Sequence, residues 1–273
     1  MKRHRAPRLA LLAAAGLLAG AAQAADQPLW ELGLGAAWVH LPHYRGSDQS
    51  REWLLPVPYA VYRGKILRAN RDGARAVLLD SEAFDFDVSV SASAPTRSDD
   101  NRARTGMADL AATAEIGPNL NSTLARGEGW KLDLRMPVHA VFTVQSKPKS
   151  IGWTASPVIN LDVQLAGWNL GVQGGPRWAS RRYHGFYYDV GLSDATSDRP
   201  AYAAESGYAG WRFTAGASRR FANFWVGAFV RADGVGGAVF DDSPLVKQRR
   251  QLTYGLALSW VLRTSDERVA EQD

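Results

Sequence analysis

The chain contains no cysteine and only three methionines, and beyond residue 24 it lacks any long hydrophobic run. Without cysteine it cannot form disulfides, and it cannot carry a lipid anchor attached to a cysteine after a signal peptide. A membrane-spanning helix needs roughly 20 consecutive apolar residues. If the protein lies in a membrane, it therefore crosses it with strands. Ten tryptophans are present, and this residue favours the interface between lipid and water.

The N-terminus has the pattern of a cleavable secretory signal. Four basic residues within the first eight precede an apolar run from Leu9 to Leu18, which is too short to span a bilayer comfortably. Small residues at Ala22 and Ala24 then occupy the positions that a signal peptidase reads. We expect cleavage between Ala24 and Ala25. The sequence thus divides into a signal peptide (1–24), one β-domain (25–262) and a polar C-terminal tail (263–273).

The positive charge of the chain comes largely from this signal. The formal net charge is +5, from 32 basic and 27 acidic side chains. Removing the four basic residues of the signal leaves 28 basic against 27 acidic, a net charge of +1. Nucleic acid is therefore not an expected partner, because electrostatic attraction to phosphates is missing.

Apolar and polar residues alternate along most of the remaining chain. Between Phe84 and Ala94 the apolar residues fall on one face of a strand, and Asp85, Asp87 and three serines fall on the other. The same pattern recurs at 130–144, 157–165 and 252–262. A soluble β-sandwich also alternates, with its apolar faces turned inward. Segments of ten residues or more favour tilted membrane strands instead.

The position of tryptophan within the first strand supports the membrane interpretation. Trp30 and Trp38 share the apolar face and lie roughly 26 Å apart at about 3.3 Å per residue. With a tilt of about 40°, this separation corresponds to roughly 20 Å of depth, close to the apolar band between two aromatic girdles.

The lengths of the connections predict the topology. Short turns, such as 63–64, 126–129, 166–167 and 222–223, mostly alternate with long loops at 40–51, 95–107, 145–153, 179–207 and 235–250. The predicted strands are 29–39, 52–62, 65–70, 75–80, 84–94, 108–124, 130–144, 154–165, 168–178, 208–221, 224–234 and 251–262. We predict an all-β fold, a transmembrane antiparallel up-and-down β-barrel of about 12 strands with short periplasmic turns and longer extracellular loops.

Enzyme chemistry has little support in the sequence. His40 and His43 lie near Ser47 and Asp48, but nothing around them resembles the motifs of outer-membrane hydrolases. We expect no catalytic residue, no cofactor and no metal site, since no cluster has metal-ligand spacing. His139 lies on a polar strand face and is expected to form hydrogen bonds in the lumen.

Two sets of charged residues leave alternatives open. The first is predicted to face the interior, where it either lines a narrow aqueous path or fills the lumen with ion pairs and water: Asp85, Asp87, Asp133, Arg135, Asp162, Arg212, Arg220, Arg231 and Asp233. The second lies in long loops and either binds lipopolysaccharide phosphates or is simply solvated: Lys147, Lys149, Arg181, Arg182, Lys247, Arg249 and Arg250.

Several loop motifs are similar in order and spacing to those of the MipA/OmpV family of outer-membrane proteins, over roughly Pro28 to Leu262. They lie in the first loop at 42–47, the large loop at 187–208, the last loop at 242–246 and the closing strand at 254–260. The residues that mark the loops are Pro42, Tyr44, Gly46, Ser47, Pro200, Tyr202, Asp242, Ser243 and Pro244. For the first four, turn formation and packing are favoured over ligand binding.

This resemblance implies a barrel in the cell outer membrane, in contact with lipid and lipopolysaccharide. It also implies a scaffold that brings a lytic transglycosylase together with a murein synthase. The alternative is a channel for small solutes. Members of the family usually end on an aromatic residue, whereas thirteen mostly polar residues follow Trp260 here.

Overall fold

The computed structural model describes residues 27–64, 67–70, 73–80 and 84–269. The predicted signal peptide, its cleavage site and the last four residues of the predicted tail lie outside them. Most described residues form antiparallel strands, with one α-helix, α1 (Arg181–Tyr188), and two short 3-10 segments. Among the described helices, none is long and apolar enough to cross a membrane.

Thirteen strands form one large sheet, and two more form a small ribbon. The ribbon pairs β1 (Gln27–Pro28) with β15 (Arg268–Val269). The strands of the large sheet are β2 (Trp30–Pro42), β3 (Ser50–Arg63), β4 (Leu67–Asn70), β5 (Gly73–Asp80), β6 (Phe84–Ser93), β7 (Thr113–Gly127), β8 (Trp130–Thr143), β9 (Ser150–Ala155), β10 (Val158–Leu165), β11 (Trp168–Ala179), β12 (Gly207–Arg220), β13 (Phe224–Gly234) and β14 (Arg250–Thr264).

Strand pairing returns to its starting point and makes the sheet a barrel. Consecutive strands pair antiparallel along the chain, and β14 pairs with β2. On the opposite wall, β9 and β10 together fill one position, since β8 and β11 each pair with both of them. The thirteen strands therefore occupy twelve positions. This confirms the predicted up-and-down barrel of about 12 strands.

Several strand boundaries differ from the prediction. The segment 154–165 is interrupted at Ser156 and Pro157, because proline has no N–H to donate to a neighbouring strand. The segment 108–124 enters the sheet only at Thr113; Leu110 instead pairs with Thr96 in a loop and is 3% exposed. At the C-terminus, β14 continues to Thr264.

The predicted alternation between the two faces is confirmed along the barrel wall. In β14, Leu252, Leu256 and Leu258 are exposed on the outside, whereas Thr253 and Ser259 are buried toward the inside. A soluble protein would rarely leave so many large apolar side chains uncovered. The apolar outer surface is therefore suited to lipid, and the interior is polar.

Aromatic side chains form two bands on the outside of the barrel. Exposed aromatics near the end that carries the chain termini are Tyr62, Phe84, Trp130, Trp168, Phe224 and Trp260. Exposed aromatics near the opposite end are Trp153, Trp178, Trp211 and Tyr254. Trp and Tyr are favoured at both surfaces of a bilayer, where one part of the ring is wet and the other apolar. The two bands thus have the arrangement of the two girdles of an outer-membrane barrel.

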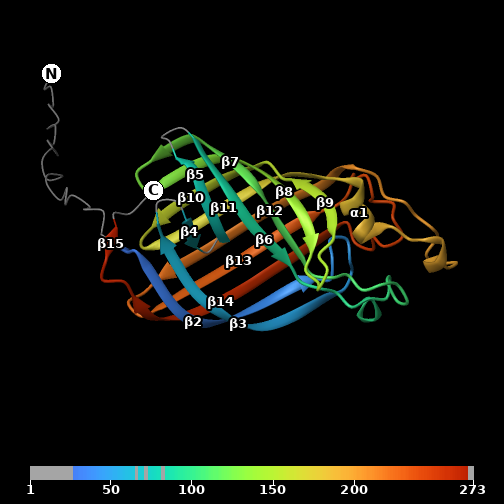
Figure 1. Cartoon of the computed structure of the whole chain (residues 1–273), viewed down its shortest axis with the longest axis horizontal. Coiled ribbons are helices and arrows are strands. Elements are labelled where there is room, and N and C mark those ends of the chain that lie inside the picture. The colour runs from blue at the N-terminus through green and yellow to red at the C-terminus, as the bar shows by residue number, and fades with distance from the viewer. Residues whose placement is uncertain (1–26, 65–66, 71–72, 81–83, 270–273) are drawn as a thin grey trace, which may run out of the picture.

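The two ends of the barrel are built differently (Figure 1). One end carries short turns and the β1–β15 ribbon. At the other end, four long connections, one of which carries α1, extend beyond the strands and gather at the barrel mouth. We call these connections the cap; they consist of residues 43–49, 94–112, 180–206 and 235–249.

The cap has an apolar core of its own, which meets the barrel wall at Ala209 of β12. The fully buried ring of Phe240 stacks on Tyr188 with centroids 3.8 Å apart, and Leu245 and Val190 pack in the same cluster. Members of this cluster come from all four connections. Burying them costs chain entropy that long loops normally retain. The loops therefore behave as one packed unit over the mouth.

Candidate functional site

The family-motif residues meet in the cap. The buried phenol of Tyr44 donates to the backbone oxygen of Leu245 at 2.8 Å, and the Ser243 hydroxyl donates to the backbone oxygen of Tyr188 at 2.8 Å. Tyr202 donates to a carboxylate oxygen of Asp242 at 2.6 Å. Burial raises the pKa of both Tyr44 and Tyr188, so these phenols remain protonated donors.

The other marked residues shape the chain around these contacts. Gly46 adopts a φ of +95°, a conformation that disfavours a side chain, and its N–H donates to Gln251 Oε1 at 2.8 Å. Pro42 ends β2, Pro244 is half-buried beside Leu245, and Pro200 is exposed on the cap surface. That Pro42, Tyr44, Gly46 and Ser47 serve turn formation and packing rather than ligand binding stays a prediction.

His43 and Ser47, in the first loop, do not form a catalytic pair. His43 Nδ1 lies 3.1 Å from Asn101 Nδ2, which donates to Ser47 Oγ at 3.0 Å. The Ser47 hydroxyl donates to the backbone oxygen of Gln49. Asn101 thus separates the two groups. His40 faces outward and stacks on Tyr254 with ring centroids 4.8 Å apart.

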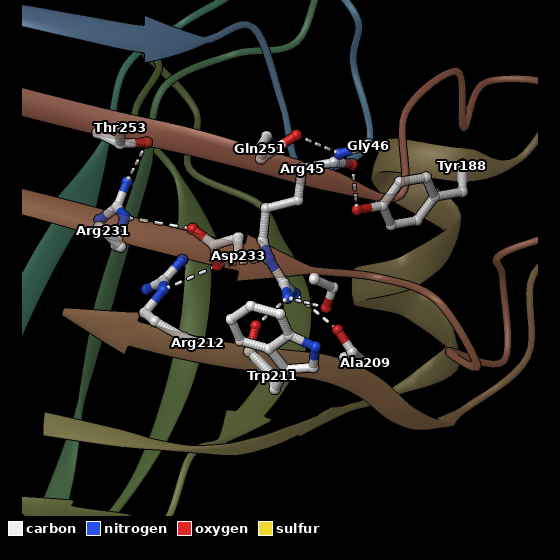
Figure 2. Close-up of polar contacts among 11 residues, drawn as sticks. Arg45, Gly46, Tyr188, Ala209, Trp211, Arg212, Arg231, Asp233, Gln251 and Thr253 are labelled. Carbon is white, nitrogen blue, oxygen red and sulfur yellow. Dashed lines mark hydrogen bonds and ion pairs between the residues drawn. The ribbon is translucent and has the colours of Figure 1, made fainter.

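Directly beneath the cap, arginines surround a buried carboxylate (Figure 2). Asp233 Oδ1 accepts from Arg45 Nε at 3.0 Å and from Arg212 Nε at 2.9 Å. Arg231 Nε lies 3.3 Å from the other oxygen, Oδ2. The cluster joins β12 and β13 to the first cap loop, since Arg45 enters from above and the other residues project from the wall.

A second ion cluster crosses the lumen near the termini. Glu31, only 3% exposed, accepts from Arg63 at 2.7 Å and from Arg220 at 2.9 Å. Arg63 also donates to the backbone oxygen of Pro28, and Arg220 to that of Ala222. This cluster connects β2, which carries Glu31, to the turns that follow β3 and β12.

Between the two clusters, the far wall of the lumen is lined by acids and amides. Asp87 accepts from Asn121 at 2.8 Å, and Arg135 pairs with Asp162 at 2.9 Å. His139 lies 2.9 Å from Ser89 Oγ and forms the predicted hydrogen bond in the lumen. The prediction that these charged side chains face the interior of the barrel is confirmed, both on this wall and in the two clusters. Within the described part of the chain, no group of three or more His, Asp or Glu side chains is placed to hold a metal ion.

Sequence reasoning did not single out Arg45 and Arg177. Arg45 lies in a loop, where the alternation of apolar and polar residues does not predict which way a side chain points. Its side chain points into the lumen because of the way the cap folds. Arg177 continues the inward-facing positions of β11, so extending that alternation to the end of the strand would have identified it.

Fold and site together define a twelve-position β-barrel of the outer-membrane type, with a packed loop cap and a polar, charged lumen. The family model for MltA-interacting protein MipA matches residues 32–262. The chain belongs to the MipA family. No curated protein sequence matches the chain.

Solved outer-membrane proteins match most of the chain at low sequence identity. A bacterial polysaccharide outer membrane secretin has 8% identity and a TM-score of 0.42, covering 87% of this chain and 99% of its own. An outer membrane channel from Pseudomonas putida has 12% identity and a TM-score of 0.40, covering 90% and 100%. Outer membrane phospholipase A from Escherichia coli has 12% identity and a TM-score of 0.34, covering 88% and 96%.

Proposed function

We propose that the protein is an outer-membrane barrel that acts as a structural scaffold for periplasmic enzymes of murein synthesis and hydrolysis. Membership of the MltA-interacting family supports a murein enzyme as partner. The observation that carries the proposal is the cap: a packed apolar core covers one mouth, Arg45 links it to the wall at Asp233, and the Glu31 cluster spans the lumen near the other end. A barrel closed in this way is better suited to holding partners than to passing solutes.

The short-turn end is the surface that this proposal assigns to the partners. Long loops of outer-membrane barrels face outward and short turns face the periplasm. Glu31 holds Arg63 and Arg220, so these side chains are not free for a partner. Among the residues that the structure describes, exposed charged side chains at this end include Arg126, Glu128, Arg263, Asp266 and Glu267.

The β1–β15 ribbon is the most prominent element at this end. Leu29 N–H donates to the backbone oxygen of Glu267 at 2.9 Å, and Trp30 N–H donates to Ser265 Oγ at 3.2 Å. Residues 265–269 are thereby paired to residues 27–30, and the β1–β15 ribbon projects beyond the wall (Figure 1). Its small area suits weak, exchangeable contacts.

Affinity capture from detergent extracts tests the scaffold. The intact protein should recover a lytic transglycosylase and a murein synthase. Recovery should be lost when residues 266–273 are removed and Arg126 and Glu128 are replaced by serine. The matched control replaces Lys147 and Lys149, two exposed charges at the opposite end, by serine. Equal recovery by the two variants, or none by the intact protein, would contradict the proposal.

Lipid and lipopolysaccharide contacts belong to the same proposal. Lys147, Lys149 and Arg182 are exposed near the outer aromatic band, where phosphates of lipopolysaccharide would lie. By contrast, Arg181 is held by Asp189 at 2.8 Å.

One observation favours the second candidate, a channel for small solutes. The side chains of Arg212 and Arg231 keep 28% and 30% of their surface accessible inside the barrel. Water therefore reaches the lumen, and ion conductance distinguishes a filled lumen from an open path.

A further inference from the structure

The arginine cluster below the cap holds more positive charge than its acids can neutralise. Arg45, Arg212 and Arg231 share the single carboxylate of Asp233 (Figure 2). A fourth guanidinium, that of Arg177, interacts electrostatically with Asp233 and with Glu115. Four arginines against two carboxylates leave a net charge of +2 in this part of the lumen.

Arg45 is the one member whose donors are well used. Besides Asp233, it donates to the backbone oxygen of Ala209 at 2.8 Å and reaches those of Trp211 and Gly234 at 3.4 Å each. Arg45 therefore anchors the cap to the wall, and the excess charge lies with the three arginines that project from the wall.

Those three wall arginines keep unused donors. Arg212 bonds Asp233 through Nε, and its two Nη groups make no hydrogen bond to any residue that the structure describes. Arg231 reaches Thr253 Oγ1 through Nη2 at a long 3.4 Å, and its Nη1 has no described protein partner. Guanidinium groups are planar forks with five donors, so several N–H groups remain available here.

Arg177 adds the clearest observation. Its residue is 8% exposed, and it forms no hydrogen bond or ion pair with the described residues. In the β11–β12 register, Gly175 lies opposite Arg212, which makes Arg177 the next inward residue above that pair. Glu115, on its other side, is engaged by Thr154 at 3.2 Å and His139 at 3.7 Å. A buried guanidinium without a bonded partner is costly unless an anion or water compensates it.

We propose that Arg177, Arg212 and Arg231 form a binding site for a small oxyanion, of the phosphate or carboxylate class, inside the lumen. Forked guanidinium donors match the oxygen pairs of both groups. The side chains of Arg212 and Arg231 keep 28% and 30% of their surface accessible, so lumen water reaches them and an anion can replace that water. This site goes beyond the scaffold function and does not depend on it.

Isothermal titration of the full-length protein, folded in detergent micelles, tests the site with inorganic phosphate at constant ionic strength. We expect saturable binding that weakens tenfold or more in Arg177→Gln and Arg212→Gln. Arg135→Gln is the matched control: Arg135 is also an inward arginine, but Asp162 neutralises it at 2.9 Å. Its affinity for phosphate should stay within twofold of the native value. Acetate in place of phosphate shows which oxyanion geometry the site prefers, and tighter binding of either supports a site.

Thermal unfolding gives a second readout that needs no variant. Because an anion that binds only the folded state stabilises it, phosphate should raise the unfolding temperature of the native protein above its value in chloride of equal ionic strength. Arg177→Lys keeps the charge but loses the fork, and it should bind phosphate with intermediate affinity. Absence of saturable heat and of a thermal shift with both phosphate and acetate would overturn the proposal. The proposal would also be overturned if Arg135→Gln lost as much phosphate affinity as Arg177→Gln.

Discussion

The phenol of Tyr188 donates a hydrogen bond to the backbone oxygen of Arg45 at 2.8 Å, across 143 residues of sequence. The Arg45 side chain continues downward to Asp233. One residue thus links the apolar core of the cap to the charged lumen. Changes to Tyr188 that loosen the cap should therefore also disturb the contact between Arg45 and Asp233 in the lumen.

Truncating Tyr188 tests the packing of the cap. Tyr188→Ala removes a ring that is 3% exposed and stacked on Phe240, so it should destabilise the cap by about 3–5 kcal/mol. Tyr188→Phe keeps the ring and loses only the hydrogen bond to Arg45, at a cost of about 1 kcal/mol. Denaturant-dependent proteolysis of the cap loops measures both. Equal midpoints for native protein and Tyr188→Ala would mean that the cap is not a packed unit.

The Glu31 cluster should stabilise the end that carries the termini. Glu31→Gln leaves Arg63 and Arg220 without their shared carboxylate, at a cost of about 3 kcal/mol if the site stays buried. Urea unfolding in lipid vesicles measures the loss. The control is Glu128→Gln, an exposed turn residue near the same end, which should change the free energy of unfolding by less than about 0.5 kcal/mol. Similar losses in both variants would argue against an ion cluster that stabilises the fold.

Arginine should be tolerated on the inner face and not on the outer face. Leu161 lies on the outside, so Leu161→Arg should cost about 2–4 kcal/mol near the bilayer midplane. Ser91 faces the lumen opposite Glu115, so Ser91→Arg should cost much less. Folding into vesicles compares the two variants. Equal costs would reverse the assignment of the barrel faces.

The cap should weaken in acid through His184. Burial lowers the pKa of His184 below its ordinary 6.5. A hydrogen bond between Nδ1 and the backbone oxygen of Glu205 raises the pKa, but by less than burial lowers it. Below pH 6.5 the unfolded cap therefore binds a proton that the folded cap does not. The contribution of His184 to cap stability is therefore fully present above pH 6.5. It falls as the pH is lowered from 6.5 to the pKa of His184 in the folded cap.

Cap proteolysis between pH 7.5 and 5 measures this dependence. His184→Phe should reduce the slope, and His43, whose pKa burial also lowers, should account for part of what remains. An unchanged slope in His184→Phe would exclude His184 as the titrating group.

Much of the barrel was predictable because its pattern is local. Alternation fixes which residues face lipid and which face the lumen, so Asp87, Arg135 and Asp233 were placed correctly from the sequence. Pro157 interrupted a predicted strand through its missing N–H, which alternation of apolar residues does not reveal.

The cap and the arginine site were not predictable in the same way. Tyr44, Leu245 and Tyr188 are far apart in the chain, and their loops carry no period that indicates a common core. The direction of Arg45 depends on that core. Family resemblance marked Tyr44, Gly46 and Ser243, and turn formation and packing were expected of the first two, but their partners Leu245, Gln251 and Tyr188 in the cap were not predictable.

Conductance across planar lipid bilayers tests the central claim, that cap and lumen clusters close this barrel. The purified full-length protein should insert without sustained ion current at moderate voltage. A barrel lacking cap residues 183–204 should conduct measurably, which shows that insertion itself was detected. Sustained, regular channels from the intact protein, equal to those of the shortened barrel, would contradict the closed scaffold and establish the channel in its place.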